Sequence, residues 1–144
     1  MSEGMALNLT QRRMVQEFQN GQFKSWLPTF QEIVGFELPV EPQWDTFFFD
    51  TDRMSAETIT SCWMDHYFRS LEHAFRGVCG DAMGRDAVKA GVKKIVIDGS
   101  QDTTNPSNST FDGGVLTINH KPCSYSASVE ERGEAWRRIL EEKL

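Results

Sequence analysis

The sequence contains neither a long hydrophobic run nor a concentration of positive charge. No apolar stretch approaches the ~20 residues that a membrane-spanning helix needs, and the start of the chain lacks the basic and then apolar residues of a secretory leader. The 21 acidic residues outnumber the 15 basic ones, which gives a net charge of −6 and disfavours contact with nucleic acid. We therefore expect a cytoplasmic protein that binds neither a membrane nor nucleic acid.

Cysteine is also scarce, with three residues in 144. Cys62 and Cys79 fall within one helical pattern and lie roughly 25 Å apart along its axis, too far for a bond between them. An odd number of cysteines in a cytoplasmic chain is typical of reduced thiols. We expect all three to be reduced.

Sequence signatures of catalysis and of metal binding are missing. There is no G-x-S-x-G elbow and no cysteine-centred protease motif. Cys62 and His66 are four residues apart on one helix face, and His120 and Cys123 are two further possible zinc ligands, but His73 lies too far along the helix to join them. We expect no metal, no cofactor and no set of catalytic residues.

The chain is long enough for one domain, 1–144, which we expect to be organised around a helix from Ser55 to Gly80, with residues 1–8 frayed. Apolar residues recur every three to four positions in this stretch: Ile59, Trp63, Tyr67, Leu71, Phe75 and Cys79. Together with their apolar neighbours they cover an arc of roughly 200°, about twice that of an ordinary surface helix. This helix is expected to be packed on more than one side.

Four more helices are predicted, over residues 9–20, 26–34, 82–91 and 129–144. Pro28 implies either that the second of them begins near Trp26 or that it is kinked there, and we expect the first. Asp81 and Ser128 are suitable N-terminal caps for the last two.

Two β-rich segments, 92–98 and 111–120, are separated by the polar stretch 99–109. The simplest arrangement is an antiparallel hairpin over about 92–120, to which residues 44–49 add a further strand in one alternative. The predicted fold class is α+β, a mostly helical single domain with a long central helix, a small antiparallel sheet and a C-terminal helix packed against it.

Residues 36–52 form the most unusual segment, because they combine five acids and five aromatic residues with no basic one. In one interpretation the aromatic side chains fill the core and the acids keep the loop hydrated. In the other, the aromatic residues anchor a partner inside an acidic rim. The second interpretation predicts a partner-binding site made of Glu37, Glu41, Trp44, Asp45, Phe48, Asp50 and Asp52.

A small acidic domain without a catalytic signature is similar in general character to bacterial immunity and antitoxin-type inhibitors. That resemblance implies a cytoplasmic binding protein that occupies and inhibits a more basic protein partner. Two alternatives remain at this stage. One is a small enzyme with Asp98, Asp112, His120 or His66 between the sheet and the central helix, and the other is a homodimeric accessory protein that buries its aromatic loop on itself.

Overall fold

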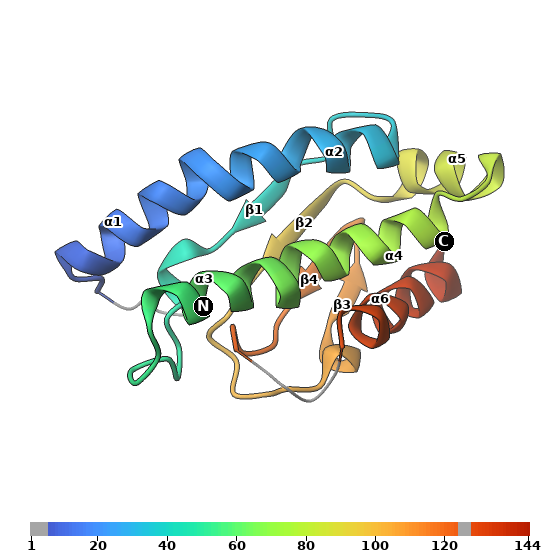
Figure 1. The fold of residues 1–144 in the computed structure, drawn as a ribbon. Helices are drawn as coiled ribbons and strands as arrows, with labels where there is room; N and C mark the ends of the chain where they lie inside the picture. The colour runs from blue at the N-terminus through green and yellow to red at the C-terminus, as the bar shows by residue number, and fades with distance from the viewer. Residues whose placement is uncertain (1–5, 124–127) are drawn as a thin grey trace.

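Long helices and a four-stranded sheet form the structure, a computed structural model that describes residues 6–123 and 128–144 (Figure 1). The helices are α1 (Leu9–Phe18), α2 (Lys24–Val34), α3 (Ala56–Trp63), α4 (Ser70–Val78), α5 (Ala82–Gly91) and α6 (Val129–Lys143). The strands are β1 (Val40–Pro42), β2 (Lys94–Ile97), β3 (Thr110–Asp112) and β4 (Val115–Ile118). The predicted α+β class is confirmed, with the C-terminal helix packed on the rest of the domain.

The central helix is present and combines α3 and α4. Ser55 caps its start by accepting a hydrogen bond from the backbone N–H of Thr58. A π-helical turn, Met64–Arg69, joins the two parts and adds a residue to the usual helical period. The large apolar side chains along this helix are buried, as expected for a helix packed on several sides.

The first helix differs from the prediction of two separate helices. It runs from α1 into α2 through a second π-helical turn, Gln19–Phe23, and Pro28 lies inside α2. The wide turn places Phe18 and Phe23, five residues apart, on the same side, and the centroids of both rings lie within 6 Å of that of Phe68. Pro28 is exposed, so water can reach the carbonyl group that its missing N–H leaves unpaired. Residues 1–5 of the expected frayed start lie outside the described residues, and Asn8 caps α1.

The strand pairing also differs from the simple hairpin. The sheet order is β1-β2-β4-β3, with β1, β2 and β4 parallel and only β3 antiparallel to its neighbour. The hairpin therefore joins β3 to β4, and Gly113 and Gly114 make its turn with positive φ angles of 59° and 82°. The stretch 99–109 connects the carboxyl end of β2 to the start of β3 at the same end of the sheet, and β3 then carries the chain back to the other end. Residues 44–46 form a 3₁₀ turn, and β1 takes the place of the strand expected there.

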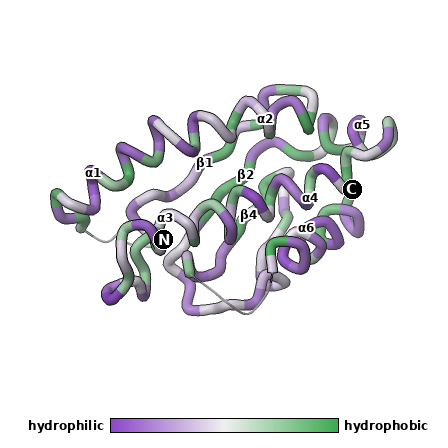
Figure 2. The backbone as a smooth tube through the Cα atoms, in the orientation of Figure 1, coloured by the Kyte–Doolittle hydropathy of each residue, from purple (hydrophilic) through white to green (hydrophobic). Residues whose placement is uncertain are grey.

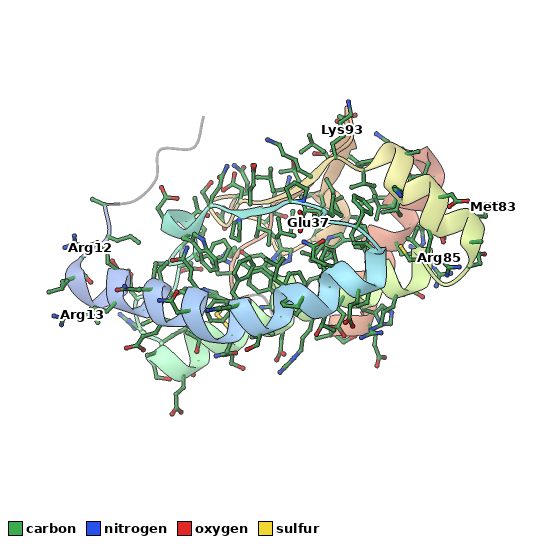
Figure 3. The ribbon with its side chains drawn as sticks, turned by 90° about the horizontal axis from the view of Figure 1, so that it is seen from above. Arg12, Arg13, Glu37, Met83, Arg85 and Lys93 are labelled. Atoms are coloured by element: carbon green, nitrogen blue, oxygen red, sulfur yellow. A yellow bond between two sulfur atoms is a disulfide. The ribbon has the colours of Figure 1, made fainter. Side chains whose placement is uncertain are left out.

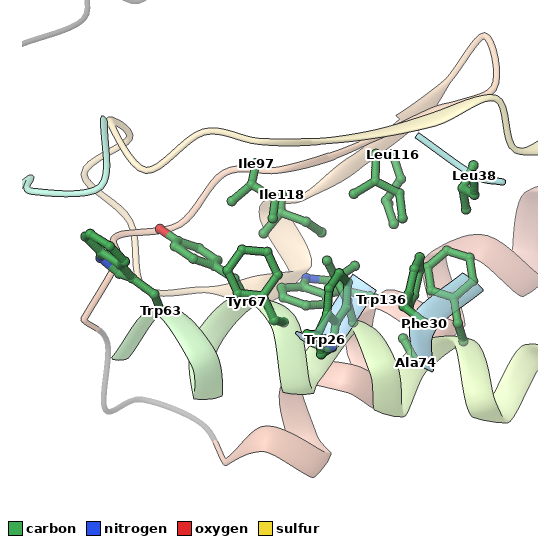
Figure 4. Close-up of a cluster of buried hydrophobic side chains, with 14 of the residues drawn as sticks. Trp26, Phe30, Leu38, Trp63, Tyr67, Ala74, Ile97, Leu116, Ile118 and Trp136 are labelled. Carbon is green, nitrogen blue, oxygen red and sulfur yellow. The ribbon is translucent and has the colours of Figure 1, made fainter. Parts of the chain in front are cut away.

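One face of the sheet packs on the helices. Ile97, Leu116 and Ile118 point from this face toward the central helix (Figure 4), and they and Ile95 are fully buried. Along the helices, hydrophobic and hydrophilic residues alternate, as amphipathic packing requires (Figure 2). The other face of the sheet carries Val96, Val115 and Thr117, which are only partly buried.

Helix α6 approaches α4 closely at Gly133. A Cβ atom at this position would lie 2.7 Å from Cδ2 of His73 and 2.9 Å from the carbonyl oxygen of Ser70. We expect Gly133→Ala to lower the free energy of unfolding by about 2 kcal/mol, because the two helices must separate to admit the methyl group. Urea denaturation would measure the change. Gly21→Ala is the control, since its Cβ meets nothing within 4 Å, and equal stability of the two variants would contradict the prediction.

Candidate functional site

The aromatic residues of the segment 36–52 belong to the core. Phe48 is 2% exposed and packs on Trp63, with ring centroids 5.3 Å apart. Trp44 is half-buried, and its ring contacts those of Phe18 and Phe23. Phe48 is therefore not an exposed contact residue in this fold, whereas Phe36 and Phe49 are partly buried.

The predicted acidic residues separate into two groups. Glu41 lies in β1 and pairs with Lys94 of β2 at 3.3 Å. Glu37 precedes the same strand and is exposed beside it (Figure 3). Asp45, Asp50 and Asp52 follow the strand and lie beyond its other end. The five acids therefore do not form a single patch.

The second group lies where the three parallel strands end, toward the left of Figure 1. The chain after β1 is tied to the chain after β2 by the backbone N–H of Gly99, which donates to Oγ1 of Thr46 at 2.8 Å. Residues beyond β4 join them through Lys121, whose Nζ lies 2.9 Å from Asp50 and 3.1 Å from Asp102. The segments after β1 and β2 carry five aspartates at this end of the sheet: Asp45, Asp50, Asp52, Asp98 and Asp102. We refer to these five residues as the acidic edge.

Basic residues at the acidic edge are few. Lys121 pairs with two of the aspartates, and hydrogen bonds to Asp50 and Asp102 raise the pKa of its ammonium group. Arg53 follows Asp52 directly and is exposed. The side chains of Asp50 and Asp102 stay 65% and 78% exposed despite their pairing. This arrangement provides an electrostatic surface for cations.

Of the residues of the enzyme alternative, His66 and His120 lie close to each other, but Asp112 does not join them. Asp112 ends β3, at the opposite end of the sheet from Asp98, and pairs with Lys143. His120 is fully buried, with its ring stacked between those of Tyr67 and Trp136. A substrate at the surface has no access to this imidazole.

Burial determines the protonation state of the polar groups around His120. Desolvation lowers the pKa of His120 to about 3, and the nearby charge of Arg132 acts in the same direction. The pKa of His66 is lowered mainly by burial as well. Burial raises the pKa of Tyr67 well above its ordinary value. The imidazoles and the phenol are thus held neutral near pH 7.

The expectation of three reduced cysteines is wrong for two of them. Cys62 and Cys123 form a disulfide, with Cα atoms 5.2 Å apart. Cys79 is a buried thiol whose pKa is raised by desolvation. Although Cys62 and Cys123 meet, no group of three or more His, Cys, Asp or Glu side chains in residues 6–123 and 128–144 is arranged to hold a metal ion.

Asp98 and Asp102 are the members of the acidic edge that the predicted binding site lacked. The sequence offers one signal for Asp98, which ends a strongly β-forming stretch. Grouping it with Asp45 requires knowing that β1 and β2 are parallel neighbours, because parallel strands bring their carboxyl ends together. Lys121 joins this edge only because β4 also runs parallel to β2.

Among the described residues, the structure has no helix that is both long and apolar enough to cross a membrane. No family model matches the chain, and no curated protein or solved structure is significantly similar to it.

Proposed function

We propose that this protein is a cytoplasmic binding protein that uses its acidic edge to occupy, and thereby inhibit, a more basic protein partner. The observation that carries this proposal is the meeting of two aspartate-bearing segments, 45–52 after β1 and 98–102 after β2, where Lys121 and Arg53 are the basic residues that the described chain places beside them. Such a concentration of one charge attracts an oppositely charged surface over about 10 Å at moderate ionic strength and speeds encounter.

The rigidity of the edge supports the same function. Thr46 accepts a hydrogen bond from the backbone N–H of Gly99, and Asp98 accepts one from the backbone N–H of Ser100 at 2.9 Å. Lys121 pairs with Asp50 and Asp102 and so links the segment after β1 to the segment after β2. Carboxylates held in place in this way lose little conformational entropy when a partner binds. The edge is therefore suited to recognition as well as to long-range attraction.

A binding surface also needs apolar contact area, and the aromatic loop does not provide it. The partly buried Val96, Val115 and Thr117 lie on the face of the sheet that the helices leave uncovered. Parallel strands usually have both faces covered in folded proteins. We expect the partner to extend from the acidic edge onto this face.

The test compares two variants that lose the same amount of charge. One carries Asp45→Asn, Asp52→Asn and Asp102→Asn at the acidic edge, and the control carries Glu17→Gln, Glu32→Gln and Glu142→Gln on exposed helix positions. In affinity capture from the native cell lysate, the wild type and the control are expected to retain one basic protein at low salt and less of it at high salt.

The edge variant is expected to retain that protein at least about tenfold more weakly, because interfacial charges set association rates. Inhibition would then be measured on the captured partner's own activity. Equal loss in both variants would show that only net charge matters and would contradict a localised site. Capture that is independent of salt would contradict electrostatic steering.

A further inference from the structure

The segment after β4 is attached to the central helix at three successive points. The hydroxyl of Tyr67 donates to the carbonyl oxygen of His120 at 2.8 Å. Nδ1 of His66 is hydrogen-bonded to the carbonyl oxygen of Pro122 at 3.0 Å. The covalent bond between Cys62 and Cys123 follows directly. This segment, residues 120–123, therefore depends on the central helix for its position.

Lys121, in the middle of the segment, connects it to the acidic edge. Its backbone N–H donates to the carbonyl oxygen of Thr103, and its ammonium group contacts Asp50 and Asp102. The disulfide lies two residues from this lysine. A change at Cys123 therefore reaches Lys121, the main positive charge of the acidic edge, through only two residues whose backbone is held by hydrogen bonds.

A hollow in the surface gives access to one end of the disulfide. It measures about 430 Å³ and is lined by Glu57, Thr58, Ser61, Cys62, Asp65 and His66. Cys62 itself is buried, and the hollow is the opening on its outer side. The third cysteine, Cys79, is also buried and does not line this hollow.

We propose that the Cys62–Cys123 bond is a reversible redox switch, opened by a dithiol protein that docks at this hollow, and that its opening releases Lys121 from the acidic edge. Disulfides in a reducing compartment are usually transient and regulatory, whereas permanent ones belong to oxidising compartments. The reducing compartment and the consequence for partner binding both rest on the proposed function, whereas the access to the bond and its link to Lys121 rest on the geometry.

The chemistry is ordinary thiol–disulfide exchange. A thiolate of the dithiol attacks Sγ of Cys62, forming a mixed disulfide, and the bond to Cys123 breaks, with Cys123 leaving as a thiolate. The second thiol of the reductant then attacks the mixed disulfide and releases Cys62 as a thiolate. Both cysteines take up a proton, and the reductant ends as a disulfide, so two electrons have moved to this protein.

Release of Lys121 changes the charge of the acidic edge. While the bond is closed, the lysine is held against Asp50 and Asp102 and offsets part of their charge. When the segment loosens, the two aspartates lose that fixed counter-charge, and the edge becomes more negative. The reduced protein is therefore the form that associates faster with a basic partner.

The first test uses the folded, oxidised protein alone, with dithiothreitol or a thioredoxin-type protein as the reductant and no denaturant. We expect alkylation followed by mass spectrometry to label Cys62 and Cys123 but not Cys79. Hydrogen exchange at residues 120–123 should rise by about tenfold or more on reduction. A bond that stays closed until the protein is denatured would overturn the proposal, as would unchanged exchange after reduction.

Filling the hollow tests the docking point. Ser61→Trp is expected to slow reduction by the thioredoxin-type protein by about tenfold, because exchange requires access to the attacked sulfur. Ser25→Trp, at an exposed position of α2, is the matched control and should leave the rate unchanged. Equal rates for both variants would show that the hollow is not the entry point.

Capture of the partner by oxidised and reduced protein separates this proposal from the proposed function. Stronger capture by the reduced form and by a Cys123→Ser variant supports the coupling to the acidic edge. If capture depends on the edge aspartates but not on the redox state, the coupling is wrong and the binding function stands. If the bond opens as predicted but nothing is captured, the binding function is wrong and the redox step stands.

Discussion

Replacing Trp63 with alanine is expected to lower the free energy of unfolding by about 4 kcal/mol, near the upper end for loss of a core aromatic residue. The side chain is fully buried, and its ring contacts those of Phe18, Phe47 and Phe48, with centroids 5.1 to 5.4 Å apart. Its indole N–H also donates to the carbonyl oxygen of Phe47 at 3.0 Å. The substitution removes both the ring packing and this bond, and it leaves a cavity among rigid neighbours.

Urea denaturation followed by circular dichroism would measure this loss. Trp63→Phe is the control, because it keeps most of the packing but loses the hydrogen bond, so we expect it to cost about half as much. A loss below about 1.5 kcal/mol in Trp63→Ala would mean that the site is able to collapse around the missing ring and that this aromatic cluster does not hold the first helix to the central helix.

Acid is expected to destabilise the protein through His120. The pKa of this imidazole is about 3 in the folded protein, against an ordinary value of 6.5. The pKa of His120 is lower in the folded than in the unfolded protein. The neutral imidazole therefore contributes its full share to the free energy of unfolding above pH 6.5, and this contribution is lost as the pH falls toward 3. From this difference, the free energy of unfolding should fall by about 2 kcal/mol between pH 7.5 and pH 5, and by about 4 kcal/mol near pH 3.5.

The cause is the surroundings of the ring. Burial between the rings of Tyr67 and Trp136 lowers the pKa most, and the charges of Arg132 and of protonated His66 lower it further. The hydrogen bond between Nδ1 and the carbonyl oxygen of Lys121 acts in the opposite direction but does not outweigh burial. Unfolding in urea at a series of pH values would measure the dependence.

His120→Phe keeps the stacking and removes the titration, so its stability should vary less with pH than that of the wild type over the same range. Part of the slope should remain, since the pKa of His66 is also lowered by burial. Identical slopes for the wild type and His120→Phe would contradict the assignment to His120.

Local features of the fold could be predicted from the sequence, because their causes are local. Asp81 and Ser128 each cap the helix that they were expected to cap, by accepting a hydrogen bond from the backbone N–H three residues later. Ser55, the first residue of the predicted central helix, caps that helix in the same way. The central helix followed from the spacing of its apolar residues. The two π-helical turns were not predicted. One inserted residue shifts the spacing of the apolar residues along the helix, and apolar residues then occur on every side of it, so the sequence pattern does not reveal the insertion.

Features that depend on distant pairing were predicted less well. The strand segments near residues 94–97 and 115–118 were recognisable, but nothing in either stretch specifies that they pair in parallel. The disulfide was missed for the same reason, since its cysteines are 61 residues apart and meet only after β4 returns to the central helix. The acidic edge depends on that pairing too, whereas the acidity of residues 45–52 was evident from composition alone.

The two edge strands of the sheet are poorly suited to pairing with a strand from another molecule. Strand β3 is three residues long, and Lys143 from α6 donates to the outward carbonyl oxygen of Phe111, so a hydrogen-bonding position of that edge is already taken. At the other edge, β1 is equally short and contains Pro42, which has no N–H to offer an incoming strand. Short edges, prolines and lysines of this kind are the features by which natural proteins prevent strand-by-strand polymerisation. The domain can therefore accumulate at high concentration in the cell without seeding fibrils through its sheet.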